Sequence, residues 1–108
     1  MDQDPFNLSQ RKVDGPYFLE RFENGNFYLQ KTGISQGGGC IEGIVEEIGW
    51  TNGFIFAKRY AMFRGDPDGW MIVDVRNQSI RGPLSEAEFR KEYPRVQTMS
   101  PKEAWGKL

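Results

Sequence analysis

A run of alternating aromatic and polar residues begins at Tyr17 and predicts the first part of the fold, a β-hairpin. Its strands cover 17–22 and 27–31, and the tetrapeptide Glu23-Asn24-Gly25-Asn26 separates them. Asn-Gly between two aromatic runs is typical of a type I′ turn, in which both central residues take positive φ. We therefore expect an antiparallel pair of strands joined by a type I′ turn at Asn24-Gly25.

Three further runs rich in apolar residues predict three more strands. Residues 41–50 mix apolar side chains with Glu42 and Glu46, which favours a bulged or edge strand whose acids face water. Residues 54–57 follow a second Asn-Gly turn and are apolar at every position, as in a central strand with both faces covered. After a Pro-Asp-Gly turn, residues 70–75 are again mainly apolar and predict the last long strand.

The last quarter of the chain changes period and predicts helices. Ser85 and Glu88 have the spacing of a capping box, in which each side chain accepts a hydrogen bond from the other residue's backbone N–H. A helix should follow to about Tyr93 and end before Pro94. The sequence Ser-Pro-Lys-Glu at 100–103 repeats the arrangement and predicts one more short helical turn.

Together these elements predict an α+β fold, with an antiparallel meander sheet of about five strands and one or two short C-terminal helices. The 108 residues fit one domain, and the 14% aromatic share can fill a small core with few side chains. We assign 17–108 to this single sheet-plus-helix domain. Residues 1–16 lack a clear pattern and are expected to form a peripheral N-terminal arm.

The charge balance and the cysteine content indicate which kinds of partner and which cellular compartment to expect. The chain has 14 basic and 15 acidic side chains, whereas a nucleic-acid-binding protein normally carries a basic excess. The single Cys40 permits no intramolecular disulfide, which is typical of a reducing compartment. No signal-peptide pattern and no membrane-length apolar run is present. We therefore expect a cytoplasmic protein that binds neither nucleic acid nor membrane.

The sequence contains no histidine, and this absence excludes several kinds of catalytic and metal site. Ser-His-Asp triads, Cys-His pairs and histidine-based metal sites all require that side chain. Cys40 follows three glycines and precedes a predicted strand rather than a helix, so a small apolar role is favoured over a nucleophile. The same glycines lack the Gly-Lys-Ser/Thr continuation of a phosphate-binding loop.

The carboxylates offer little better support for catalysis or metal binding. Asp66 and Asp68 lack the remaining ligands of a calcium loop and favour an ordinary turn. Glu42 and Glu46 would lie about 13–14 Å apart along one strand, too far for a glycosidase pair. Asp74 ends an apolar run, where anchoring by Arg76, Arg81 or a backbone amide near Gly82 is favoured over catalysis. We expect no metal and no cofactor.

A group of aromatic and charged residues between 59 and 70 is the remaining candidate for a site. Arg, Met and aromatic side chains are enriched at protein–protein interfaces. The alternative is an extended hairpin whose rings fold back onto the core. With the glutamates of the 41–50 strand included, the predicted partner-binding residues are Glu42, Glu46, Glu47, Arg59, Tyr60, Phe63, Arg64 and Trp70.

Two segments resemble a known group of proteins. Trp70-Met71-Ile72-Val73-Asp74-Val75, followed by Gly82-Pro83-Leu84-Ser85-Glu86-Ala87-Glu88-Phe89, is similar to small bacterial strand-rich proteins of unknown activity. Several such families resemble immunity proteins, which are encoded beside secreted toxins and neutralise them by direct binding. The resemblance covers roughly residues 17–93, and its motifs are structural, so no site residue is carried over from it.

The resemblance implies a non-enzymatic protein that blocks a partner by direct contact, in the manner of an immunity or antitoxin-like inhibitor. Its partner would be another protein, such as a toxin encoded nearby, and the chain itself would be a monomer or a homodimer. Two alternatives stay open. One is a small-ligand-binding or accessory domain with a pocket between sheet and helix, and the other is a carboxylate-dependent enzyme built on Asp74.

Overall fold

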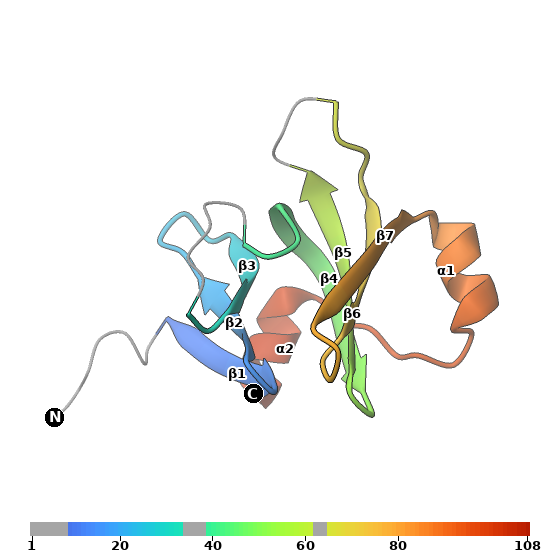
Figure 1. Ribbon diagram of the computed structural model, residues 1–108. Coiled ribbons are helices and arrows are strands. Elements are labelled where there is room, and N and C mark those ends of the chain that lie inside the picture. Colours follow the sequence, from blue (N-terminus) through green and yellow to red (C-terminus); the bar gives the residue numbers. More distant parts are fainter. Residues whose placement is uncertain (1–8, 34–38, 62–64) are drawn as a thin grey trace, which may run out of the picture.

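The computed structural model describes residues 9–33, 39–61 and 65–108, which form two antiparallel sheets and two short helices (Figure 1). Sheet A has the strand order β1-β2-β3, and sheet B has the order β4-β5-β6-β7. The elements are β1 Gln10–Asp14, β2 Tyr17–Arg21, β3 Phe27–Lys31, β4 Gly43–Thr51, β5 Phe54–Ala61, β6 Gly69–Asp74, β7 Ser79–Leu84, α1 Glu86–Glu92 and α2 Pro101–Lys107.

The α+β class is confirmed, but the single five-stranded meander is wrong, because the described residues form seven strands in two sheets. Strand β1 lies inside 1–16, which the sequence assigned to an arm; it pairs with β2 in register Gln10↔Glu20. The arm prediction is therefore wrong for 10–14, and residues 1–8 lie outside the described part. The other missed strand, β7, contains Gly82-Pro83 and lies at a sheet edge, where the missing N–H of proline is tolerated.

The two Asn-Gly turns differ in conformation. Asn52 and Gly53 have φ values of 47° and 83°, so the type I′ turn joins β4 to β5. The β2–β3 hairpin is confirmed, but its turn is not type I′, because only Gly25 of the Asn24-Gly25 pair has positive φ (89°). There the Gly25 N–H donates to the Phe22 carbonyl at 3.0 Å.

Strand β4 has both features that its mixed pattern predicts. It lies at an edge of sheet B, and its register with β5 shifts between Val45 and Glu47, which leaves Glu46 as the bulge residue. Glu42 and Glu46 are exposed, as expected for acids that face water. The bulge explains why neither parity of the strand is purely apolar, because the extra residue shifts the alternation by one position.

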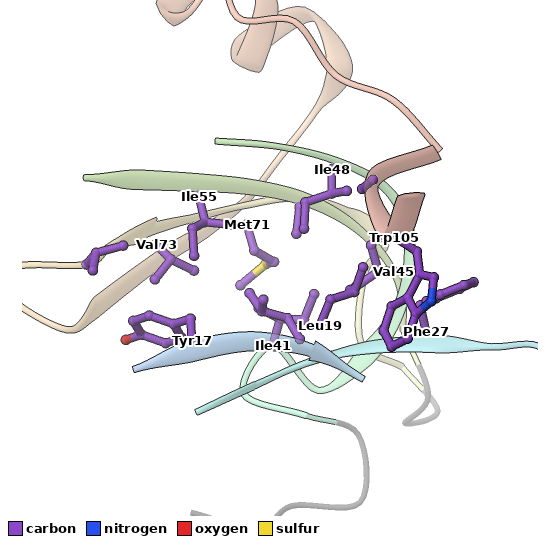
Figure 2. Packing of buried hydrophobic residues seen from close by; sticks show 14 residues of the cluster. Tyr17, Leu19, Phe27, Ile41, Val45, Ile48, Ile55, Met71, Val73 and Trp105 are labelled. Atoms are coloured by element: carbon purple, nitrogen blue, oxygen red, sulfur yellow. The ribbon is translucent and has the colours of Figure 1, made fainter. Parts of the chain in front are cut away.

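The larger hydrophobic core lies between sheet A and one face of sheet B (Figure 2). Trp105 of α2 closes one end of this core, with its ring centroid 5.8 Å from that of Phe27. The guanidinium groups of Arg11 and Arg21 lie 4.8 and 4.9 Å from the centroid of the Trp105 ring. The central side chains are Tyr17, Leu19, Leu29, Ile41, Ile48, Ile55 and Val73.

A smaller core covers the opposite face of sheet B. Phe89 of α1 stacks on Trp70 of β6 with ring centroids 4.1 Å apart, and Phe56 and Ile72 complete the buried set. Ser85 and Glu88 form the expected capping box of α1. Because cores lie on both faces of sheet B, β5 and β6 are apolar on both faces, as their sequences predict.

The segment after α1 passes around the edge of β4 to reach α2. The backbone at Gln97 lies so close to Gly49 that a Cβ at this glycine would come within 2.4 Å of the Gln97 carbonyl oxygen. Ile48 and Met99 then form an isolated antiparallel bridge. Neither described helix has the length and apolar character needed to cross a membrane.

Candidate partner-binding surface

Trp70 is a core residue, so its assignment to a partner-binding surface is wrong. Its side chain is 0% exposed, and its indole N–H donates to Oε1 of Glu86 at 2.9 Å. The register of β6 against β5 places Trp70 opposite Lys58, on the face that α1 covers. The ring therefore folds back onto the core, which was the alternative interpretation of the 59–70 group.

Arg59 also has a structural role, so its prediction as a surface contact is wrong. The residue is 6% exposed, and Nη1 donates to the Ile41 carbonyl at 2.7 Å. Nη2 and Nε donate to the Pro67 carbonyl at 3.1 and 3.4 Å. A buried guanidinium requires such partners, and these bonds hold the backbone at 41 and at 67 against the same side chain.

The glutamates of the predicted site divide into two kinds. Glu47 is half-buried; Oε2 accepts a hydrogen bond from the Thr98 hydroxyl and lies 3.9 Å from Nη2 of Arg90. Its contacts hold the segment after α1 against β4. Glu42 and Glu46 remain exposed. The predicted contacts Phe63 and Arg64 lie outside the described residues.

Among the predicted contact residues, Tyr60 is also the most exposed large apolar residue in the described part of the chain. It is 54% exposed, compared with 41% for Phe22 and 38% for Ile80. It pairs with Ile44 of β4, so the two side chains share one face of the sheet. They lie at the end of sheet B toward which the β5 arrow points, whereas α1 contacts β6 and β7 (Figure 1).

Two aspartates complete this end of the sheet. The Ala61 backbone N–H donates to Oδ1 of Asp68 at 2.8 Å, and Ala61 pairs with Gly43. Asp66 and Asp68 flank Pro67, which Arg59 binds, and both are exposed. We use the name Tyr60 surface for the residues at this end of sheet B that are exposed or half-buried. Ile44 and Tyr60 share one face, and the exposed acidic residues at neighbouring positions of the chain are Glu42, Glu46, Asp66 and Asp68.

Sequence reasoning missed three members of the Tyr60 surface. Asp66 and Asp68 were recognised only as turn residues, and Ile44 only as an apolar strand position. The alternation of inward and outward side chains along β4 could have placed Ile44 on the same face as Tyr60. The bulge at Glu46 shifts that alternation, so the sequence alone does not show which face Ile44 occupies. The aspartates join the surface through Arg59, whose long-range contacts leave no trace in the local pattern.

Asp74 closes the turn between β6 and β7. Its Oδ1 accepts hydrogen bonds from the backbone N–H groups of Arg76 and Asn77, both at 3.1 Å, and Oδ2 accepts one from the Asn77 amide at 3.1 Å. The expected anchoring is therefore confirmed, with the Arg76 backbone as one partner. Arg81 instead pairs with Glu92, 2.5 Å between Nη2 and Oε2.

Cys40 lies where a thiol is a poor nucleophile. Burial raises the pKa of the thiol to about 11, so its reactive thiolate form is scarce at neutral pH. Its backbone N–H donates to the Leu29 carbonyl at 2.8 Å, which ties the residue to β3. Across residues 9–33, 39–61 and 65–108, no three His, Cys, Asp or Glu side chains are grouped to hold a metal ion.

Open hollows occur away from the Tyr60 surface. One of about 640 Å³ lies on sheet A and is lined partly by Lys12, Phe18 and Gln30. Another of about 550 Å³ lies where Trp50 meets Tyr93 and the segment that follows it. The space between α1 and the centre of sheet B, where a pocket was an alternative expectation, is filled by the stacked Phe89 and Trp70 rings.

Comparison of the chain with protein-family models, with curated proteins and with solved structures gives no significant match.

Proposed function

We propose that this chain is a non-enzymatic protein that binds another protein through the Tyr60 surface and blocks it by contact, in the manner of an immunity or antitoxin-like inhibitor. The observation that carries the proposal is the 54% exposed Tyr60 ring beside the half-buried Ile44. An exposed aromatic ring next to an aliphatic side chain has the composition of an interface centre.

The local geometry favours a protein partner over a small ligand at this position. Tyr60 is the second-to-last residue of β5. The two hollows described above are lined by other residues. A small ligand needs a concave site that encloses most of its surface, whereas a protein partner can enclose a protruding ring. The proposal also places the protein in the cytoplasm, with its single Cys40 reduced.

The second candidate function is small-ligand binding on sheet A. The hollow of about 640 Å³ there supports it, because Lys12, Gln30 and Glu20 supply polar groups around the Phe18 ring. Enzymatic chemistry on Asp74 has weaker support, since both carboxylate oxygens are occupied by the turn.

The proposal is tested by co-expressing the tagged chain with the protein encoded beside its gene and measuring the complex by size exclusion with light scattering. We expect a stoichiometric complex and loss of the partner's activity in proportion to the chain added. Tyr60→Ala should weaken the complex by about 30-fold, the effect of a moderate interface hot spot of about 2 kcal/mol.

Ile80→Ala provides the matched control. Ile80 is a large exposed apolar residue on β7, and its pairing with Val73 places it on the opposite face of sheet B from Tyr60. This variant should bind like the unmodified chain. A complex that resists Tyr60→Ala, or no complex at all, would contradict the proposal.

A further inference from the structure

A row of three side chains crosses the outer face of sheet A. Lys12 of β1, Phe18 of β2 and Gln30 of β3 lie directly opposite one another in the register of the three strands. Their chain neighbours Leu19 and Leu29 belong to the larger core, so the row lies on the face turned away from sheet B. Side chains at opposite positions have Cβ atoms about 4.5–5.5 Å apart, so an ammonium group and an amide flank the Phe18 ring.

Gln30 gives this row a buried polar group. It is 6% exposed, although solvent normally reaches the outer face of a sheet whose other face covers a core. Its Nε2 donates to Oε1 of Glu20 at 3.1 Å, which orients the amide and engages the carboxylate. Both residues line the hollow of about 640 Å³ described above. A buried, oriented amide in a hollow of this size is typical of a small-ligand site rather than of a solvated sheet face.

The Phe18 ring supplies a flat apolar surface in the same hollow. Phe18 is half-buried and belongs to the lining. On the same face of the sheet, the rings of Phe22 and Tyr28 contact each other with centroids 4.7 Å apart. Phe18 contacts no other ring within the described residues. Its ring is therefore available to stack on the ring of a ligand.

The charged residues of the lining favour an anion. They are Lys12, Lys31 and Glu20, so positive charge is in excess here, although the net charge of the chain is −1. Glu20 already accepts the hydrogen bond from Gln30. Among the residues that the structure describes, every ion pair involves a residue of α1, so neither lysine has a carboxylate partner there. A negatively charged ligand would supply that partner.

Resting on the second candidate function, small-ligand binding on sheet A, we propose that the hollow takes a planar aromatic molecule that carries a negatively charged group such as a carboxylate. Its ring stacks on Phe18, and its anionic group lies beside the ammonium of Lys12. Gln30, on the other side of the ring, is in position to bind a polar substituent. An aliphatic anion loses the stacking and a neutral aromatic molecule loses the ion pair, so the two features together give the selectivity.

The experiment titrates the ¹⁵N-labelled chain with naphthalene carboxylate, its neutral amide and cyclohexane carboxylate, and follows backbone amide shifts by NMR. We expect naphthalene carboxylate to bind in the millimolar range, as a small ligand in an open hollow does, and to shift the amides of residues 10–12, 18–20 and 30–33. The neutral amide and the aliphatic anion should each bind about threefold more weakly, because each lacks one of the two interactions.

Two pairs of variants separate the site from general attraction. Lys12→Gln should lower the affinity for naphthalene carboxylate to that of its amide and leave the amide's affinity unchanged, a difference that a merely structural role would not produce. Lys107→Gln removes the same charge at an exposed position of α2 and should change neither affinity. Phe18→Leu should abolish the advantage of naphthalene carboxylate over cyclohexane carboxylate. Phe22→Leu removes an exposed ring outside the lining and should retain that advantage.

The results that would overturn the inference also show how far the failure extends. If all three probes bind at these residues with equal affinity, or if Lys12→Gln acts no more strongly than Lys107→Gln, small-ligand binding on sheet A stands and the aromatic anion falls. If no probe shifts these amides, or if the shifts spread over the whole chain, the small-ligand candidate falls as well. The complex at Tyr60 is on sheet B and is tested separately with the partner protein.

Discussion

Arg59 shows how one buried side chain can serve both stability and the exposed surface. Its guanidinium has two backbone carbonyls as partners, those of Ile41 and Pro67. A charged donor to a carbonyl contributes more than a neutral one, and the larger penalty comes from leaving the buried acceptors without a donor.

We therefore expect Arg59→Ala to lower the free energy of unfolding by about 2–4 kcal/mol. Urea denaturation followed by circular dichroism measures the change. Arg76→Ala, which removes an exposed arginine after β6, is the matched control and should change the value by less than about 0.5 kcal/mol. A loss as small as the control's would mean that the bonds to Ile41 and Pro67 contribute little.

The sequence could not assign Arg59 and Trp70 to the interior, and the reason lies in strand alternation. In β5 and β6 both faces are covered, so apolar residues occupy both parities and no polar face marks the outside. Tyr60 follows Arg59 directly, yet the tyrosine is exposed and the arginine is buried. Residue type alone would suggest the reverse.

At the scale of elements, α1 has an N-terminal cap that the sequence predicts and tertiary contacts that it does not. The capping box at Ser85 was predictable, whereas the hydrogen bond from Trp70 to Glu86 depends on how α1 lies on sheet B. This bond, followed by that from Arg90, lowers the pKa of Glu86. The hydrogen bond from Arg81 lowers the pKa of Glu92, and the backbone N–H of Ser85 lowers that of Glu88.

These shifts predict that the protein loses stability in acid. Each of the three carboxyls has an ordinary pKa of 4.5 and a lower pKa in the folded chain, so their contribution is complete above that value and is lost as the pH falls through the lowered values. Urea midpoints measured from pH 6 to pH 3 should fall in the acidic half of the range.

The corresponding triple variant, Glu86→Gln with Glu88→Gln and Glu92→Gln, should show a weaker dependence on pH, because these side chains no longer titrate. Lys102→Gln alters the charge of α2 instead and should retain the full dependence. An unchanged slope in the triple variant would show that other groups dominate the acid response.

The sequence predicts an element where a local pattern of apolar residues, a turn or a helix cap defines it. It does not predict a strand that forms only because a neighbouring strand pairs with it. Strands β2 to β6 and both helices have clear patterns of apolar residues, turns or caps. Strand β1, with the sequence Gln-Arg-Lys-Val-Asp, has no such alternation and forms because β2 offers it an edge. Strand β7 is exposed at four of its six positions, so burial leaves no signal for it in the sequence.

At the scale of the whole molecule, sheet B belongs to both hydrophobic cores. Ile55 and Val73 face sheet A, while Phe56 and Ile72 of the same two strands face α1. The segment from α1 to α2 passes around β4. It therefore connects α1, which belongs to the smaller core, to α2, which belongs to the larger core. Damage to either core is therefore expected to reach the other through the shared strands.

This sharing predicts a single cooperative unfolding transition. Phe89→Leu in the smaller core and Trp105→Phe in the larger one should each lower the free energy of unfolding by about 1–2 kcal/mol. In both variants the whole urea transition should move without splitting, and far-ultraviolet circular dichroism and tryptophan fluorescence should give the same midpoint. An earlier partial transition in Phe89→Leu, with the larger core still folded, would show that α1 and its core unfold independently. In that case the shared strands do not couple the two cores, and loosening α1 would leave Arg59 and the Tyr60 surface in place.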